Sequence, residues 1–160
     1  MNSTKNKIKI YKGEIPLSLQ IKISYILKEI QPFYYKNIID WFFDKIFNSS
    51  NVIYLIIEND IEIEAIAILK STQIENKLRT LYVRKKYRNK NYGLKLINQV
   101  DKIFNSDYIF SYPEELKGFF NKIVEYKKYN ITYIIQDYYR LGKKEYFVNY
   151  KPNNFKKDYR

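Results

Sequence analysis

The sequence predicts one α/β domain, built from a mixed sheet with helices on both of its faces. The chain has 160 residues, 46% of them hydrophobic, which is long and apolar enough for one buried core. Short apolar runs typical of strands recur along its length. Segments with the spacing of helices lie between them, and helices and strands alternate regularly only in the second half.

The first 50 residues predict one strand and two helices. Residues 7–11 alternate apolar and basic side chains, which indicates a short strand. Apolar residues recur at helical spacing over residues 19–30, and Pro32 ends or kinks that helix. A second helical stripe covers residues 38–47, with Asn37 in position to cap it.

Three strands follow. Residues 52–57 form a continuous, mostly β-branched apolar run, as expected for a well-buried strand. Asn59-Asp60 is a turn signal, and residues 61–69 form the second arm of a hairpin. Residues 78–83 predict another strand, and a strongly basic segment comes directly after it.

The second half alternates between the two kinds of element. Apolar spacing predicts helices over residues 96–104 and 116–124. The intervening residues 108–112 read as a strand, and the last two strands are residues 131–135 and 145–149. We therefore assign residues 1–150 to one domain and residues 151–160 to a polar, basic tail that frays.

Composition excludes several kinds of chemistry. The chain has no Cys and no His, which excludes disulfides, a Cys nucleophile, a Ser-His-Asp triad and His-ligated zinc, and we expect no metal site. Its net charge of +12 attracts polyanions such as nucleic acid or a phosphorylated cofactor. No apolar run is long enough to span a membrane, so we expect a cytoplasmic protein without membrane contact.

The most informative segment joins a strand to a helix through a basic turn. Five cations fall within residues 84–90, just before the helix that includes Leu96. Backbone N–H groups that converge at a helix start form an anion site, and a diphosphate suits it. Neither the Walker phosphate-binding pattern nor the Gly-x-Gly-x-x-Gly pattern is present.

This segment resembles the acetyl-CoA motif of the GNAT N-acetyltransferase superfamily, Arg/Gln-x-x-Gly-x-Gly/Ala after a strand ending in Leu-x-Val. Asn91 stands where the first Gly belongs, and Asn tolerates a positive φ better than most residues. The resemblance extends along nearly the whole chain. It implies a mostly antiparallel sheet of about seven strands, splayed in the middle at a cofactor slot. The implied acetyl-CoA-binding residues are Leu81, Tyr82, Val83, Arg88, Asn89, Lys90, Asn91, Tyr92 and Gly93.

The resemblance also implies direct transfer of an acetyl group from acetyl-CoA to a primary amine. Tyr126 fits the family position whose phenol protonates the leaving thiolate, although Phe119 replaces an Asn often found seven residues earlier. A backbone N–H near Tyr82-Val83 is expected to stabilise the thioester oxygen. For the base we expect Glu62 or Glu64, with Glu58 as a further candidate, acting through water.

Other interpretations stay open. Trp41, Phe42 and Phe43 either form the floor of an acceptor pocket or belong to the core. The acceptor could be a protein N-terminus or lysine, a small amine or an RNA-linked amine, and the protein a monomer or homodimer. The charge also suits a nucleic-acid-binding protein, and Asn91 together with the missing strand Glu suits a CoA-binding protein without catalysis.

Overall fold

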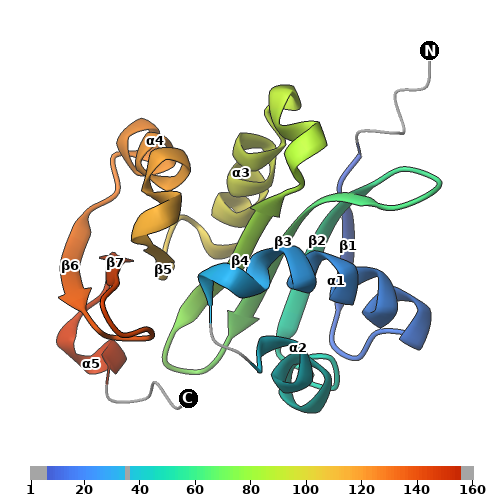
Figure 1. The fold of residues 1–160 in the computed structure, drawn as a ribbon, viewed down its shortest axis with the longest axis horizontal. Helices are drawn as coiled ribbons and strands as arrows, with labels where there is room; N and C mark the ends of the chain where they lie inside the picture. Colours follow the sequence, from blue (N-terminus) through green and yellow to red (C-terminus); the bar gives the residue numbers. More distant parts are fainter. Residues whose placement is uncertain (1–6, 35–36, 156–160) are drawn as a thin grey trace.

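The strands of the computed structural model, which describes residues 7–34 and 37–155, form two neighbouring antiparallel sheets (Figure 1). The first has the order β1 (Lys9–Lys12), β2 (Val52–Glu58), β3 (Ile63–Ser71), β4 (Asn76–Val83). The second has the order β5 (Phe110–Pro113), β7 (Lys144–Val148), β6 (Ile131–Gln136). A single parallel bridge, between Lys77 and Ile109, links β4 to β5. The predicted mixed, mostly antiparallel fold is confirmed.

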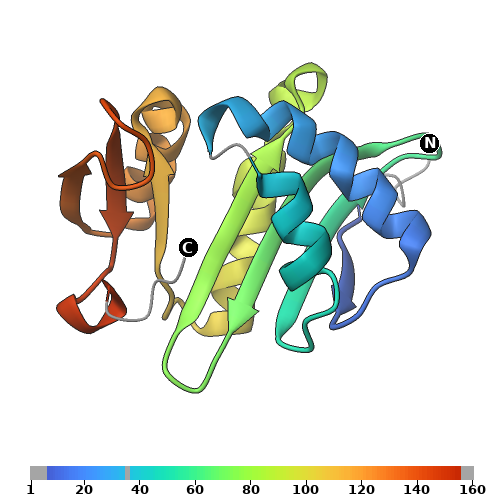
Figure 2. The same cartoon turned by 60° about the horizontal axis from the view of Figure 1, so that its bottom comes forward.

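Helices cover both faces of the sheets, as predicted (Figure 2). We call the face under α1 (Leu17–Ile30) and α2 (Ile38–Trp41) the front face. The face under α3 (Tyr92–Phe104) and α4 (Lys117–Lys127) is the back face. The shorter helical elements are η2 (Gln31–Phe33), η3 (Phe42–Ile46), η4 (Lys85–Lys90), η5 (Glu114–Leu116) and α5 (Pro152–Phe155). No helix within these described ranges is long and apolar enough to cross a membrane.

Two large apolar clusters explain why β3 is apolar on both sides. Ile66 and Ile68 belong to the front cluster, which contains Ile23 of α1. Ala67 belongs to the back cluster, which contains Leu96 of α3. A strand covered on both faces reads as a continuous hydrophobic run, which is the pattern that the sequence has here.

The second predicted helix is not uniform. It begins as α2, with Asn37 at the N-cap position but making no side-chain cap bond, and continues as a π-helical turn, η3. The turn is closed by the N–H of Phe47, which donates to the carbonyl of Phe42 at 2.9 Å. Phe42 and Phe47 are buried in the front cluster, so this segment anchors the end of the helix to the sheet.

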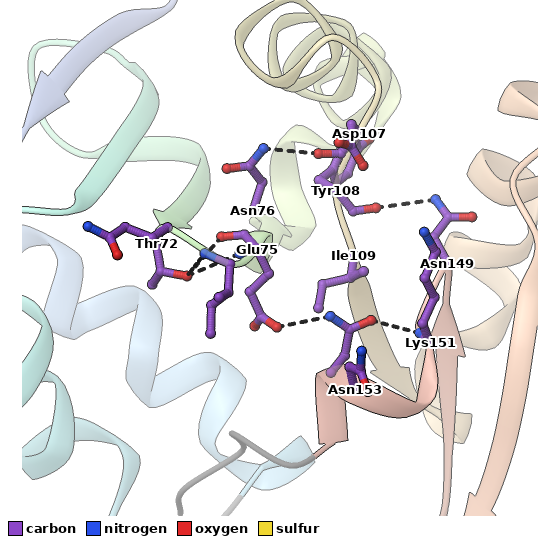
Figure 3. A pocket seen from close by; sticks show the side chains of 12 residues that line it. Thr72, Glu75, Asn76, Asp107, Tyr108, Ile109, Asn149, Lys151 and Asn153 are labelled. Carbon is purple, nitrogen blue, oxygen red and sulfur yellow. Dashed lines mark hydrogen bonds between the residues drawn. The ribbon is translucent and has the colours of Figure 1, made fainter.

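A network of asparagine side chains surrounds the junction of the two sheets (Figure 3). Asn76 Nδ2 donates to the carbonyl of Asp107 at 3.1 Å, and Asn149 Nδ2 donates to that of Tyr108 at 3.2 Å. Asn154 Nδ2 donates to Glu75 Oε1 at 3.0 Å. These bonds fix the end of β4 at which β4 and β5 meet.

The expectation that the tail frays from Lys151 is wrong for residues 151–155. Residues 152–155 form α5, and Phe155 packs edge-on against Tyr133 with ring centroids 5.1 Å apart. The Lys151 N–H donates to Asn154 Oδ1 at 2.7 Å. Aromatic packing therefore holds residues 152–155 against the domain, although the polar composition of the segment predicts that it is exposed and frayed. Residues 156–160 lie outside the described residues.

Candidate active site

The strands β4 and β5 meet at one end and separate toward the other (Figure 2). At the junction the Leu78 N–H donates to the Ile109 carbonyl at 2.9 Å, and the Ile109 N–H donates to the Asn76 carbonyl at 3.0 Å. Within the described part of the chain, this bridge is the one ladder contact between the two sheets. The remainder of β4 therefore presents an open edge, which is the splay that the sequence resemblance implies.

The backbone of Val83 points into this opening. Val83 pairs with Ala65 of β3, and the next N–H, that of Arg84, donates to the Glu64 carbonyl at 3.0 Å. In an antiparallel ladder this pattern makes Val83 and Ala65 a non-hydrogen-bonded pair, so the N–H and C=O of Val83 are directed away from β3. Arg88 confirms the direction, because its Nε donates to the Val83 carbonyl at 2.9 Å.

A left-handed residue starts α3 beside this edge. Asn91 has φ 58° and ψ 28°, as its replacement of a glycine predicts, and its side chain makes no cap hydrogen bond. The first N–H groups of an α-helix have no carbonyl partner within the helix. Those of Gly93 and Leu94 therefore carry the partial positive charge of the helix N-terminus, next to a turn rich in Lys and Arg.

A cavity of about 410 Å³ lies between the open edge, the start of α3 and α4. Gly93 is buried at its wall, where an added Cβ would lie 2.8 Å from Cζ of Phe119. Phe119, in the position where the sequence resemblance expects Asn, thus forms an apolar wall. The lining residues are Val83, Arg88, Asn91, Tyr92, Gly93, Leu94, Phe119, Lys122, Ile123 and Tyr126.

The structure brings Tyr126 to the same cavity as the predicted motif. Its side chain is 64% exposed and belongs to the last turn of α4. Asp101 of α3 holds that end of α4, because it pairs with Lys127 Nζ at 2.7 Å and accepts a hydrogen bond from the Tyr129 hydroxyl. The phenol of Tyr126 is therefore carried on an anchored helix end beside the open strand edge.

The other motif residues occupy different positions. Leu81 and Tyr82 are buried, Leu81 in the back cluster and Tyr82 in the front cluster. Asn89 and Lys90 are exposed and do not line the cavity. Tyr92 is buried, and its hydroxyl donates to Glu64 at 3.1 Å. Burial, together with this bond to a carboxylate, raises the pKa of Tyr92 to about 12.

Glu62, predicted as the base, does not line the cavity that contains Tyr126. It lines a separate cavity beside α1 rather than the one that contains Tyr126. Its carboxylate pairs with Lys86 at 2.6 Å and Arg84 at 2.8 Å, and accepts a hydrogen bond from Tyr87. The Lys86 contact, and then the Tyr87 bond, lower the pKa of Glu62 to about 2. A carboxylate with so low a pKa is a weak base.

Glu64 and Glu58 are also outside the cavity. Glu64 is the extra residue of a bulge opposite β2, is 4% exposed, and binds Tyr92 as described. Glu58 lies between Lys9, at 4.0 Å, and Lys22, at 3.5 Å. None of the three carboxylates predicted as the base therefore lines the cavity that contains Tyr126.

The aromatic residues considered for an acceptor pocket have mixed positions. Phe42 is buried in the core, and Phe43 and Trp41 are half-buried against it. The Trp41 ring stacks under the guanidinium of Arg79, 4.5 Å from its centroid. Arg79 is the extra residue of a bulge in β4, which turns its side chain to the front face.

Sequence reasoning missed part of the cavity wall. Phe119, Lys122, Ile123 and Tyr126 share one side of α4 because residues three, four and seven apart lie on one helix face. That spacing, counted backward from Tyr126, was the available signal. The helix predicted over residues 116–124 rests on apolar spacing alone, which does not show that this side of the helix lines a cavity.

Comparisons with known proteins agree with this geometry at the level of the fold. No protein-family model matches the sequence, and no curated protein matches it by sequence. Many solved structures match it in three dimensions. The ribosomal-protein-S18-alanine N-acetyltransferase from Escherichia coli aligns with TM-score 0.70 and 13% identity, over 89% of this chain and 92% of that chain.

Two further structures show the range of proteins with this fold. NAA60 from Arabidopsis thaliana, in complex with acetyl-CoA, aligns with TM-score 0.67 and 15% identity, covering 92% of this chain and 99% of that one. The aminoglycoside 6'-N-acetyltransferase from Enterococcus faecium aligns with TM-score 0.61 and 14% identity, over 88% and 94%. The chain has the fold of the GNAT acetyltransferases, as its sequence motifs suggest.

Proposed function

We propose that this protein is an N-acetyltransferase that moves the acetyl group of acetyl-CoA to a primary amine. One observation carries the proposal: a single cavity joins the open edge of β4, the amide-rich start of α3 and the phenol of Tyr126. Structural neighbours with this fold are acetyltransferases, one of them in complex with acetyl-CoA. At 13–15% sequence identity, these neighbours support the fold alone. The proposed activity therefore rests on the geometry of the cavity.

The start of α3 suits the diphosphate of the cofactor. The N–H groups of Gly93 and Leu94 and the helix dipole favour an anion there. The buried Gly93 lets the backbone approach closely, since any larger side chain would meet Phe119. Arg88 adds a cation beside these amides while its Nε is held by Val83.

The strand edge and the tyrosine provide the remaining functions. When bound, acetyl-CoA supplies the activated acetyl group. The Val83 N–H, directed into the opening, can donate to the oxygen that gains charge during the reaction. Tyr126, on the opposite wall, can give a proton to the leaving sulfur.

Replacing Arg88 with alanine is expected to weaken acetyl-CoA binding about 10- to 150-fold, because a charge-assisted contact contributes roughly 1.5–3 kcal/mol. Isothermal titration calorimetry measures the change. Lys102→Ala, which removes an exposed cation from the far end of α3, is the matched control and is expected to bind like wild type. Equal weakening in both variants would indicate general charge attraction and favour a polyanion-binding protein.

Asn91→Gly is expected to tighten acetyl-CoA binding, because it removes a carboxamide from the edge of the phosphate site and keeps the left-handed backbone. Asn105→Gly is the control, since Asn105 has φ 51° at the other end of the same helix. Calorimetry of both variants separates the local effect from a general effect of glycine. Weaker binding by Asn91→Gly would show instead that the carboxamide contacts the cofactor.

A CoA-binding protein without catalysis would bind the cofactor and release no thiol. A thiol-release assay over peptides, polyamines, aminoglycosides and aminoacyl-tRNA tests this directly. We expect release with at least one of these acceptors. Binding without release from any of them would contradict the enzymatic proposal and leave the cofactor site standing.

A further inference from the structure

We infer that Glu145 of β7 is the general base that accepts the proton of the acceptor ammonium, an assignment that rests on the proposed acetyltransferase function. None of the carboxylates expected from the sequence lines the cavity that contains Tyr126, and Glu145 does not line it either. Its place on the front face and its strand register carry the assignment. Glu145 is one of three buried polar or charged side chains among the described residues, and the proposed mechanism above does not otherwise use it.

Glu145 lies on the front face, opposite Tyr126. On β5, Phe110 and Tyr112 point to the back face, where both rings pack against Phe120 of α4. Ser111, between them, therefore points forward. The Ser111 hydroxyl donates to Glu145 Oε2 at 2.8 Å, which places the carboxyl on the front face as well.

Glu145 is also close to the open part of β4 in register. The junction pairs Lys77 with Ile109. Because Arg79 is the extra residue of a bulge in β4, four ladder steps from this junction lead to Tyr82 on β4 and to Pro113 on β5. Pro113 is the ladder partner of Glu145. The carboxyl is thus level with the section of β4 that ends in Val83, across the gap in which the acetyl group would lie.

The surroundings of Glu145 fit a base that cycles between charged and neutral forms. The side chain is 6% exposed, and this burial raises its pKa to about 7. Ser111, Arg140 of the β6–β7 turn and Lys77 of β4 oppose the rise, while Glu115 of η5 adds to it. Arg140 itself is held by two bonds to Glu115, at 2.6 and 2.9 Å. A base is most effective when its pKa is close to the working pH.

Opposite faces suit the two proton transfers. The ammonium of the acceptor gives one proton to the Glu145 carboxylate, and the neutral amine forms the C–N bond to the acetyl carbon. The C–S bond breaks, and the departing sulfur takes a proton from Tyr126. The nitrogen loses its second proton through water, which restores the phenol. Glu145 then releases its proton to solvent, so the reaction yields amide, CoA thiol and one proton.

The test compares Glu145→Gln with wild type in the full-length protein, using as probe the fastest acceptor among a free-N-terminus peptide, a polyamine and an aminoglycoside. For wild type we expect kcat/KM to rise with pH and level off above a midpoint near 7. At pH 7 we expect Glu145→Gln to lose about 100-fold in kcat/KM and to bind acetyl-CoA within about twofold of wild type. The loss in kcat/KM should become smaller as the pH approaches the pKa of the acceptor amine, because an amine that is already neutral needs no base. Glu125→Gln, an exposed carboxylate of α4, is the control.

Three results would overturn the assignment. The first is a Glu145→Gln variant with the wild-type pH profile. The second is a variant that loses acetyl-CoA affinity and activity at all pH values alike, which indicates a structural role. The third is a Glu62→Gln variant, rather than Glu145→Gln, whose kcat/KM no longer rises with pH. If the wild-type protein acetylates an amine, the proposed function stands under each of these three results. Wild-type protein that binds acetyl-CoA and acetylates no amine would refute that function, and the base with it.

Discussion

Replacing Tyr126 with phenylalanine is expected to lower kcat about 100-fold or more and to change the Kd for acetyl-CoA less than about twofold. Proton transfer by a positioned side chain contributes about 10²–10⁴-fold to a rate. The substitution removes only the hydroxyl of an exposed side chain at the cavity, so the α4 wall and its Asp101 anchor remain. Stopped-flow or steady-state thiol release gives kcat, and calorimetry gives Kd.

Tyr25→Phe is the matched control for this experiment. Tyr25 is an exposed tyrosine of α1, at 56% against 64% for Tyr126, and it does not line the cavity. We expect its kcat to equal that of wild type. A Tyr126→Phe variant that turns over like wild type would show that Tyr126 is not the acid and that the thiolate leaves without it.

Glu145→Gln is expected to stabilise the protein by about 3 kcal/mol at pH 8 and hardly at all at pH 4. The folded pKa near 7 lies above the ordinary value of 4.5, so between these values the folded protein keeps a proton that the unfolded chain releases. The free energy of unfolding of wild type therefore falls as the pH rises through this window. Glutamine removes that loss and still accepts the Ser111 bond.

Urea unfolding of both proteins at pH 4 and pH 8 measures the difference. Glu125→Gln, at an exposed site on α4, is expected to change stability by less than about 0.5 kcal/mol at either pH. An equal effect of Glu145→Gln at both pH values would mean that the carboxyl is not buried in a charged form at neutral pH. Greater stability with lower activity is a common property of functional groups held in unfavourable surroundings.

Most of the fold could be predicted because local patterns and tertiary packing agree. The run from Ile63 to Leu69 is apolar on both sides because helices cover both faces of β3. The bulge at Arg79 could not be predicted, since it depends on how β4 pairs with β3. Nor could the packing of Phe155, which depends on Tyr133 and Tyr138, whose chain positions are distant from it.

The candidate site likewise has one part that the sequence predicts and one part that it does not. Arg88, Asn91 and Gly93 lie in one turn, so their spacing alone predicts the anion site, and the φ of Asn91 agrees. The base depends on burial and on charges from separate elements. Glu62 is surrounded by cations that lower its pKa, whereas Glu145 lies in a strand whose sequence gives no sign that its side chain points inward. Only the three-dimensional arrangement separates these two carboxylates.

The proposed function requires that the open edge of β4 and the start of α3 together hold acetyl-CoA. An NMR titration of ¹⁵N-labelled protein with CoA tests this requirement, because it reports on individual backbone N–H groups. We expect saturable shifts of the Val83, Gly93 and Leu94 amide signals, with the signals of β1 and β6 unchanged. Saturable shifts confined to other surfaces, or no shift at millimolar CoA, would contradict it.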